Sequence, residues 1–202
     1  MLQIKTVKPR AISVLKELMA MPELANFSLV GGTALSLLYG HRMSVDLDLF
    51  SNKPFQNTEI IAALEAKFKH SFVNRSTNPN LGEVKIDIIR HPHPLIRPET
   101  TQEGIRFFST EDIIAMKVQA ILGRGKKKDF WDIAELLKHF TVKDFIQFHK
   151  EKYSTQNLLI TVPQAITFFA DAEESEAPIS LKKQTWESVQ AFIQNKVREY
   201  LV

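Results

Sequence analysis

The spacing of apolar residues predicts that the N-terminal half of the chain combines helices with short strands. Apolar residues recur every three or four positions in three stretches, which predicts helices over residues 9–19, 33–39 and 58–69. Shorter apolar or alternating runs predict strands over residues 27–30, 45–50, 71–75 and 83–89. We therefore expect a mixed α/β N-terminal half.

Beyond residue 108 the helical spacing continues to the end of the chain. Ser109 and Asp112 have the spacing of a capping box, which predicts that a helix begins there. Helices are predicted over residues 109–122, 129–140, 143–153, 156–169 and 181–201, with Pro163 as a break in the fourth. The chain is therefore interpreted as a mixed α/β core, residues 1–108, followed by a helical domain, residues 109–202.

The predicted strand 45–50 carries two aspartates one residue apart. Alternate side chains of a strand share a face, so Asp46 and Asp48 are expected to project together. Their apolar neighbours can then enter a core: Val45, Leu47 and Leu49. Two carboxylates on one face repel unless a cation lies between them, and hard oxygen ligands suit Mg²⁺, which commonly accompanies a phosphate-bearing substrate.

Asp87, on the strand predicted over 83–89, is the candidate third carboxylate. It falls on the more polar face of that strand, where it could join the pair or simply face solvent. An outward polar face is also the ordinary explanation for Asp46 and Asp48, although two like charges on one strand face cost stability unless something compensates. Two Mg²⁺ ions about 3.5–4 Å apart would activate a hydroxyl and stabilise a leaving pyrophosphate, with Asp87 as the base or acting through the second metal.

Gly31, Gly32 and Thr33 stand between a predicted strand and a predicted helix. Glycine lets a phosphate approach the backbone closely, and the first amides of the helix point toward it. Glycine pairs also serve as plain connectors, but the nearby aspartates favour the phosphate-binding interpretation.

Composition and charge narrow the choice of chemistry. The 202 residues include no cysteine, so any metal must be held by oxygen or imidazole. No apolar run approaches the ~18–20 residues that span a bilayer, and the N-terminus lacks a signal-peptide core, so a cytoplasmic protein without membrane contact is expected. The net charge of +3 is mild, but four of residues 124–128 are cationic, which suits a polyphosphate or RNA, or a solvated loop.

Two blocks of sequence together resemble the motifs of a known family. The first is Gly31-Gly32-Thr-Ala-Leu with His41-Arg42-x-Ser44-x-Asp46-x-Asp48-Leu-Phe50; the second is Lys117-x-x-Ala120-x-x-x-Arg124-Gly125-x-x-x-Asp129-Phe130-x-Asp132. Between them, Val84-Lys85-Ile86-Asp87 supplies an acidic strand. The arrangement resembles the AbiEii/AbiGii nucleotidyltransferase-like toxins, within the DNA polymerase beta type nucleotidyltransferases.

The resemblance implies an α+β nucleotidyltransferase fold, a small mixed β-sheet flanked by helices and followed by a helical C-terminal region. It implies a nucleoside triphosphate as substrate, Mg²⁺ or Mn²⁺ as cofactor, an RNA acceptor with tRNA favoured, and a cognate antitoxin as partner in a toxin–antitoxin or phage-defence system. Carried over by position, the metal ligands are Asp46 and Asp48, and Asp87 on the intervening acidic strand is the candidate third ligand. The phosphate cradle is Gly31, Gly32 and Thr33, the nucleotide contacts are Arg42, Lys117 and Arg124, and the acidic residue of the last motif is Asp129.

Several of these residues also have a structural explanation. Lys117 could be a solvated helix cation, and Arg124 and Asp129 could cap adjacent helices. His41 is interpreted as a turn residue or hydrogen-bonding partner.

His91 and His93 are the remaining candidate metal ligands. The prolines that alternate with them favour an exposed loop instead.

The leading hypothesis is therefore a metal-dependent nucleotidyltransferase acting on RNA. The alternatives are a catalytically silent nucleotide- or partner-binding module, and a nucleotidyltransferase acting on a protein or small molecule. A silent member would be expected to lose one of Asp46, Asp48 and Asp87, and this chain has all three.

Overall fold

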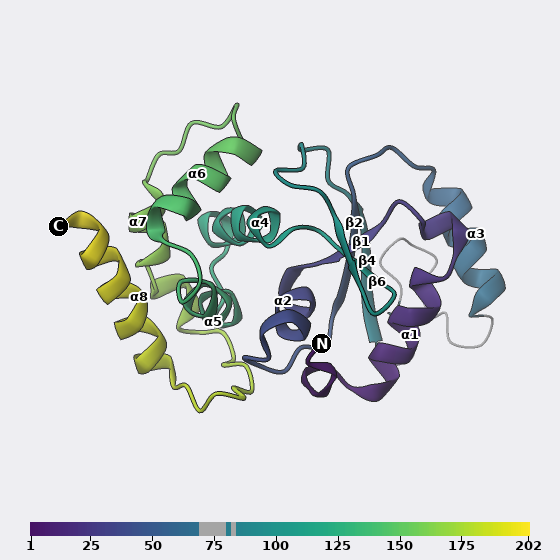
Figure 1. The fold of residues 1–202 in the computed structure, drawn as a ribbon, viewed down its shortest axis with the longest axis horizontal. Coiled ribbons are helices and arrows are strands. Elements are labelled where there is room, and N and C mark those ends of the chain that lie inside the picture. Colours follow the sequence, from purple (N-terminus) through teal and green to yellow (C-terminus); the bar gives the residue numbers. More distant parts are fainter. Residues whose placement is uncertain (69–79, 82–83) are drawn as a thin grey trace.

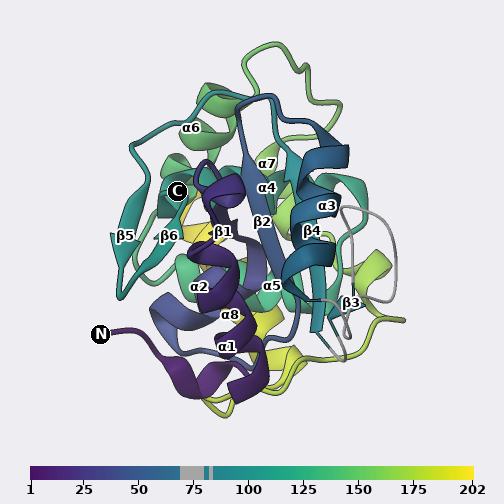
Figure 2. The same ribbon diagram turned by 90° about the vertical axis from the view of Figure 1, so that its right-hand side faces the viewer.

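A computed structural model describes residues 1–68, 80–81 and 84–202 of the chain, which form an α+β fold built on a mixed sheet. Among the described residues the sheet has six strands in the order β3-β4-β2-β1-β6-β5. The strands are β1 Ser28–Val30, β2 Leu47–Ser51, β3 Asn80–Leu81, β4 Val84–Arg90, β5 Thr100–Gln102 and β6 Ile105–Phe107. Figure 2 shows β3 and β5 at opposite edges.

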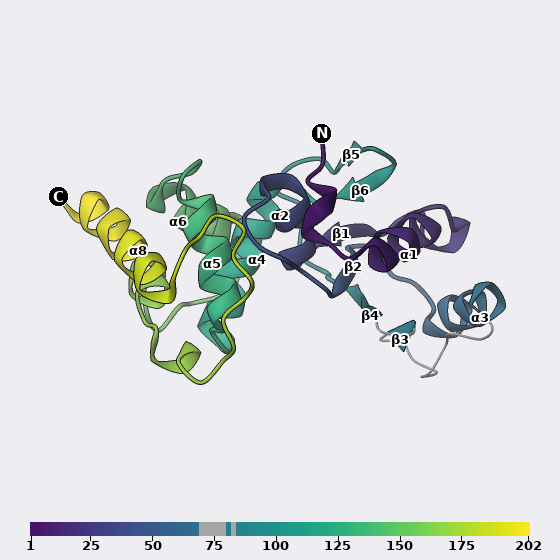
Figure 3. The same cartoon turned by 90° about the horizontal axis from the view of Figure 1, so that it is seen from below.

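Helices cover both faces of this sheet. They are α1 Pro9–Met19, α2 Gly31–Tyr39, α3 Asn57–Lys67, α4 Thr110–Gly123, α5 Lys127–Leu136, α6 Val142–Lys152, α7 Val162–Ile166 and α8 Trp186–Leu201, with 3₁₀ turns at Ile4–Thr6, Pro22–Leu24 and Ala170–Ala172. In Figures 1 and 3, α1 and α3 lie on one side of the sheet and α2 on the other, with α4 to α8 stacked beyond α2. Since α2 contacts both α4 and α5, it joins the sheet to the helical half.

The central strand β2 pairs antiparallel with β1 and parallel with β4. In this register Asp48 lies opposite Val30 on one side and Asp87 on the other. Two carboxylates from strands far apart in the sequence are thereby placed side by side, at the point where β1 ends and α2 begins.

Strand alternation predicts the core of the sheet correctly once the strand begins. Leu47, Leu49, Ile86 and Ile88 are buried, as their alternation with polar residues predicted. Val45 does not enter the core: its side chain is 51% exposed, because β2 begins only at Leu47 and the preceding residues are irregular.

The structure confirms most predicted helices and corrects two. Helix 9–19 matches α1, but the helix predicted over 156–169 is reduced to α7, because Pro163 occupies the first turn, where proline starts helices. The helix predicted from residue 181 begins at Trp186, where Thr185 accepts a hydrogen bond from the amide of Ser188. The strand predicted over 71–75 lies outside the described residues.

The segment before α8 crosses back to the loop that precedes β2. The amide of Met43 donates to the carbonyl of Ile179, and the amide of Leu181 donates to the carbonyl of His41, both at 2.9 Å. Residues 179–181 therefore hold the loop 41–43 by backbone hydrogen bonds.

A second link between the two halves is a fully buried ion pair. Lys152 Nζ at the end of α6 lies 2.6 Å from Asp112 Oδ1 in the first turn of α4, and it also donates to the carbonyl of Pro94. The Asp112 carboxylate accepts hydrogen bonds from the amides of Ile96 and Arg97 as well. Every oxygen of this carboxylate has a partner, which is the condition for keeping a charge in a core.

No helix in the described part of the chain is long and apolar enough to cross a membrane.

The Lys152 pair generates a stability prediction. Lys152→Met should lower the free energy of unfolding by about 3–5 kcal/mol, because it leaves the Asp112 charge buried without its cation. Urea denaturation measures the loss, and Lys196→Met, which removes a partly exposed pair with Glu199 on α8, is the control expected to change stability little. Equal small losses for both variants would show that the buried pair does not stabilise the fold.

Candidate active site

The turn from β1 into α2 is shaped by the absence of a side chain at Gly31. This residue has a left-handed φ of +69°, and a Cβ there would overlap the Asp48 carboxylate. The first amides of α2 have no acceptor within the helix, and the helix dipole adds partial positive charge at this end. The carboxylate edge of β2 therefore lies beside a helix start suited to bind an anion.

The three candidate carboxylates lie at this point. Asp48 and Asp87 are paired in register on β2 and β4, and Asp46 precedes β2 by one residue. The sequence had left open whether Asp87 joins the pair or faces solvent. Burial raises the pKa of Asp48 from 3.8 to about 6; the Lys117 ammonium opposes the shift, and the neighbouring charges of Asp87 and Asp46 increase it. The ionised form of Asp48 is therefore unfavourable in this setting.

Two partly exposed lysines contact the carboxylates from either side. Lys128 Nζ, at the start of α5, lies 3.4 Å from Asp46 Oδ2, and Lys85 Nζ lies 3.0 Å from Asp87 Oδ2. The other oxygen of Asp87, Oδ1, is buried without a hydrogen-bond partner. An unpartnered carboxylate oxygen beside a second carboxylate is a place where a cation would be stabilised.

These features fit a divalent metal, although the side chains as they stand are not a finished coordination sphere. Among the described residues, no three His, Asp or Glu side chains are arranged to hold an ion. The donor set is nevertheless composed of hard oxygens, with a buried orphan oxygen and a raised pKa that a cation would lower. Asp46, Asp48 and Asp87 are the residues that would hold the metal once Lys85 and Lys128 give way.

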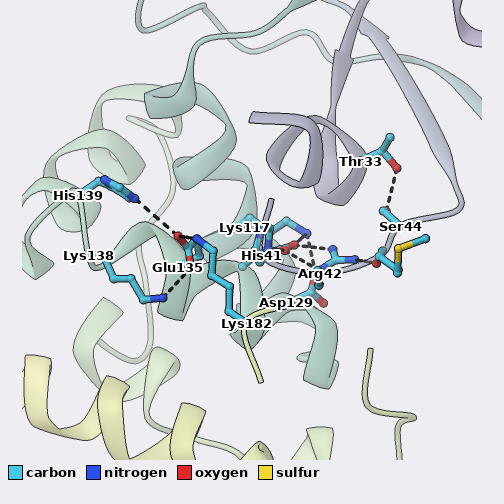
Figure 4. A network of polar contacts seen from close by, with 12 residues as sticks. Thr33, His41, Arg42, Ser44, Lys117, Asp129, Glu135, Lys138, His139 and Lys182 are labelled. Carbon is cyan, nitrogen blue, oxygen red and sulfur yellow. Dashed lines mark hydrogen bonds and ion pairs between the residues drawn. The ribbon is translucent and has the colours of Figure 1, made fainter. Parts of the chain in front are cut away.

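Behind the carboxylates lies a buried network centred on Asp132 of α5. The guanidinium of Arg42 binds this carboxylate in a bidentate manner, with Nε 2.7 Å from Oδ1 and Nη2 2.9 Å from Oδ2. His41 Nε2 contacts Oδ1 at 2.7 Å, and Lys117 Nζ lies 2.7 Å from Oδ2. Burial alone would raise the pKa of Asp132, but Arg42 and Lys117 hold it well below the usual value. Figure 4 shows His41, Arg42 and Lys117 close to one another, beside Asp129.

Lys117 is not a solvated helix cation. Its side chain is buried, and Nζ also lies 2.9 Å from Asp129 Oδ1. Burial would lower the pKa of Lys117, but the carboxylates of Asp132 and Asp129 raise it, so the ammonium remains charged. Of the three N–H groups of an ammonium, two face these carboxylates, which leaves one for a ligand.

Asp129 is not the N-cap that the sequence favoured, because α5 begins two residues earlier, at Lys127; at the third position of the helix it combines a capping hydrogen bond with this ion pair. Its Oδ2 accepts a hydrogen bond from the Lys126 amide at the start of α5, while Oδ1 holds Lys117. Burial would raise the pKa of Asp129, but Lys117 lowers it. We therefore describe Asp129 as a positioning residue.

Two other predicted nucleotide contacts have side chains committed to the protein. The Thr33 hydroxyl bonds to Ser44 Oγ at 2.8 Å and to the backbone carbonyl of Asp46, so it ties α2 to the loop that carries the aspartate. The Arg42 guanidinium is buried against Gly32, where a Cβ would overlap it. Both side chains support the site from behind, and contact with nucleotide stays a prediction for them.

The basic run 124–128 divides into residues with different surroundings. Lys127 is fixed by the segment between α7 and α8: its amide donates to Ser175 Oγ and its Nζ donates to the carbonyl of Glu173. Lys128 reaches Asp46, whereas Arg124 and Lys126 are exposed. Arg124 follows α4 at its C-cap position, as its structural interpretation predicted.

Asp132 was missed as a site residue by sequence reasoning, although it stands in the second motif. The available signal was its spacing of three from Asp129, which places both on one side of a helix. His41 was interpreted correctly as a hydrogen-bonding partner.

His91 and His93 lie in a loop, as predicted, but the two rings are not fully exposed. Both rings are half-buried and pack on Tyr153, with the ring centroid of His93 4.6 Å from that of Tyr153. Burial, together with the nearby Lys152, lowers the pKa of His91 to about 4, so this imidazole is neutral at physiological pH.

A separate groove of about 880 Å³ lies on the helical half, between α6, α7 and the end of α8. Its lining is largely apolar and includes Leu159, Tyr200 and Leu201. The carboxylates and their lysines take no part in this groove, so we place the candidate active site at β2 and β4.

The raised pKa of Asp48 predicts how stability depends on pH. The pKa of Asp48 is about 6 in the folded state and 3.8 in the unfolded chain. Ionisation of Asp48 therefore destabilises the fold increasingly as the pH rises from about 3.8 to about 6, and to the full extent above pH 6. In metal-free buffer, Asp48→Asn should raise the free energy of unfolding by about 1–3 kcal/mol at pH 7.5 and by much less at pH 4. Denaturant titrations at both pH values measure this. An equal effect of the variant at both values would contradict the shift, and the exposed Asp171→Asn is the control.

The close packing at Gly32 gives a second prediction. Gly32→Ala should cost about 1–3 kcal/mol, because the added methyl displaces a guanidinium that Asp132 holds in place. Gly123→Ala is the matched control, since its Cβ would meet nothing within 4 Å and should leave the melting temperature unchanged or slightly raised. Thermal unfolding of the two variants measures the difference, and equal melting temperatures would show that the loop 41–43 yields easily.

Most of the chain is similar to known proteins. Residues 13–196 match the model of the family described as nucleotidyl transferase AbiEii toxin, type IV TA system. The uncharacterised protein aq_aa25 of Aquifex aeolicus (strain VF5) is 35% identical over 185 residues, 87% of this chain and 88% of its own length.

Two solved structures from Helicobacter pylori share the fold. JHP933 superimposes with a TM-score of 0.58 at 19% identity, covering 96% of this chain and 92% of its own. A protein assigned as a nucleotidyltransferase gives the same TM-score at 18% identity, with 95% of both chains covered. Because the family match extends over most of the sequence, the chain belongs to the AbiEii family of nucleotidyl transferase toxins.

Proposed function

We propose that this protein transfers a nucleoside monophosphate from a nucleoside triphosphate to a hydroxyl of RNA, with tRNA as the favoured acceptor. The observation that carries the proposal is the pairing of Asp48 with Asp87 in adjacent parallel strands, directly beside the helix start at Gly31. Carboxylate oxygens suited to a metal, beside backbone amides suited to a phosphate, support the proposal.

The residues present divide the chemistry between them. A divalent ion, Mg²⁺ or Mn²⁺, held by Asp46, Asp48 and Asp87 would supply positive charge to the triphosphate. The first amides of α2, at Gly31 and Gly32, bind phosphate oxygens. The third N–H of Lys117 binds a phosphate while its other two keep Asp129 and Asp132 in place.

The transfer itself forms one bond and breaks another. The acceptor oxygen bonds to the α-phosphorus, the bond from that phosphorus to the bridging oxygen breaks, and pyrophosphate leaves with the electron pair. The proton of the hydroxyl passes to Asp87, whose Oδ1 has no hydrogen-bond partner of its own. No covalent intermediate on the protein is needed.

The division of the chain at residue 108 assigns separate tasks to its parts. The core, 1–108, supplies the carboxylates and the helix start, and the helical domain, 109–202, supplies Lys117, Asp129 and Asp132. The exposed Arg124 and Lys126 would guide the RNA backbone.

Family membership supports a physiological setting for this activity. The family is described as one of type IV toxin–antitoxin systems. We propose that the chain is the toxin of such a system, acts in the cytoplasm and is countered by a cognate antitoxin.

A transfer assay tests the proposal. Full-length protein is incubated with Mg²⁺ or Mn²⁺, each α-labelled nucleoside triphosphate in turn, and total RNA, protein or aminoglycosides. Label should enter RNA, and Asp87→Asn should slow this by at least about 100-fold, the usual contribution of a catalytic base. The exposed Asp171→Asn is the matched control.

Other outcomes identify the alternatives. Label in protein or aminoglycoside but not in RNA would assign a different acceptor. Tight nucleotide binding without any transfer would identify a silent nucleotide-binding module.

A further inference from the structure

Lys128 differs from Lys117, the buried lysine near the carboxylates, in how firmly its ammonium is held. Lys117 Nζ is buried between two carboxylates at 2.7 and 2.9 Å. The Lys128 side chain is 40% exposed, and its contact with Asp46 is 3.4 Å long. Partly exposed, long ion pairs of this kind contribute little free energy and exchange readily.

The backbone that carries Lys128 is fixed even though its side chain is not. On one side, Lys127 is anchored to Ser175 and Glu173 and lies over the ring of Trp186. On the other side, Asp129 is locked by Lys117 and by the Lys126 amide. The Lys128 ammonium is thus a cation on a long flexible stem whose base stays beside the carboxylate site.

An ammonium at Asp46 and a divalent ion at Asp46 exclude each other. Lys128 Nζ already contacts Oδ2 of this carboxylate, and two cations a few ångströms apart repel. A triphosphate carries the opposite charge and lies within the same small volume if the metal and the helix start of α2 bind it. The ammonium therefore has a second partner as soon as nucleotide arrives with the metal.

We propose that Lys128 is an exchangeable counter-cation: it neutralises Asp46 in the free protein and moves to the triphosphate when a metal-bound nucleotide enters. This inference rests on the proposed function and adds to it a coupling between the two ligands. The metal alone must compete with Lys128 and binds weakly, whereas nucleotide removes the competitor and gains an ionic contact. By thermodynamic linkage, nucleotide must strengthen metal binding and metal must strengthen nucleotide binding by the same factor.

The test measures binding rather than turnover. Titration calorimetry of full-length protein with Mn²⁺ alone gives the metal affinity, and the same titration with a saturating non-hydrolysable α,β-methylene nucleoside triphosphate, each base in turn, gives the coupling. Lys128→Gln should bind Mn²⁺ alone about 3- to 10-fold more tightly than the wild type, because a local competing charge is gone. In that variant the strengthening of Mn²⁺ binding by nucleotide should shrink by a similar factor.

Two further variants separate this role from others. Lys126→Gln removes a lysine charge two residues away, at the N-cap of α5, where the side chain has no carboxylate contact among the described residues. The Mn²⁺ affinity of this variant should stay near that of the wild type. Lys128→Arg keeps an exchangeable cation and should restore most of the coupling. A variant that merely damages the site would bind Mn²⁺ less tightly, which is the opposite of the expected change.

The failure of this inference differs from failure of the proposed function. If wild-type protein binds both ligands and Lys128→Gln binds Mn²⁺ alone no more tightly, the counter-cation role is overturned while the proposed function stands. If wild-type protein binds neither Mn²⁺ nor any of the nucleotides, both are overturned.

Discussion

The buried carboxylate of Asp132 is the interaction on which the rest of the site depends. It is the common partner of Arg42 and His41 from the loop before β2 and of Lys117 from α4. A buried charge of this kind is tolerated only when it is fully paired, so all four side chains hold each other in one arrangement. Through them, α5 fixes the loop that leads into the aspartate strand and so helps to set where the carboxylates lie.

The same network explains how the protein keeps an unfavourable cluster of negative charge. The three carboxylates lie close together at the start of β2 and within β4, and burial together with the neighbouring charges of Asp87 and Asp46 raises the pKa of Asp48. The sheet register and the buried network impose this proximity. Packing elsewhere in the fold offsets its electrostatic cost. The result is a preorganised site in which a bound cation and phosphate would relieve the repulsion between the carboxylates. Such preorganisation stabilises charge that develops during a reaction.

The sequence alone predicts the parts of this arrangement that depend on local patterns. Alternation placed Leu47 and Leu49 in the core and the aspartates opposite them, and glycines marked the start of α2. The register that sets Asp48 against Asp87 could not be read locally, because it depends on parallel pairing of strands separated by α3. The role of Asp132 was not predicted for a related reason: its partners come from other elements of the fold. The errors at Val45 and at residues 156–169 arose where a regular pattern extended beyond the element that formed.

The backbone bridge between residues 179–181 and the loop 41–43 has a consequence for the timing of activity. The loop that carries Arg42 is supported on one side by α5 and on the other by a segment made much later in translation. A nascent chain exposes the glycine turn and all three aspartates long before either support emerges from the ribosome. The loop is therefore held on both sides only once the chain has been synthesised through residue 181.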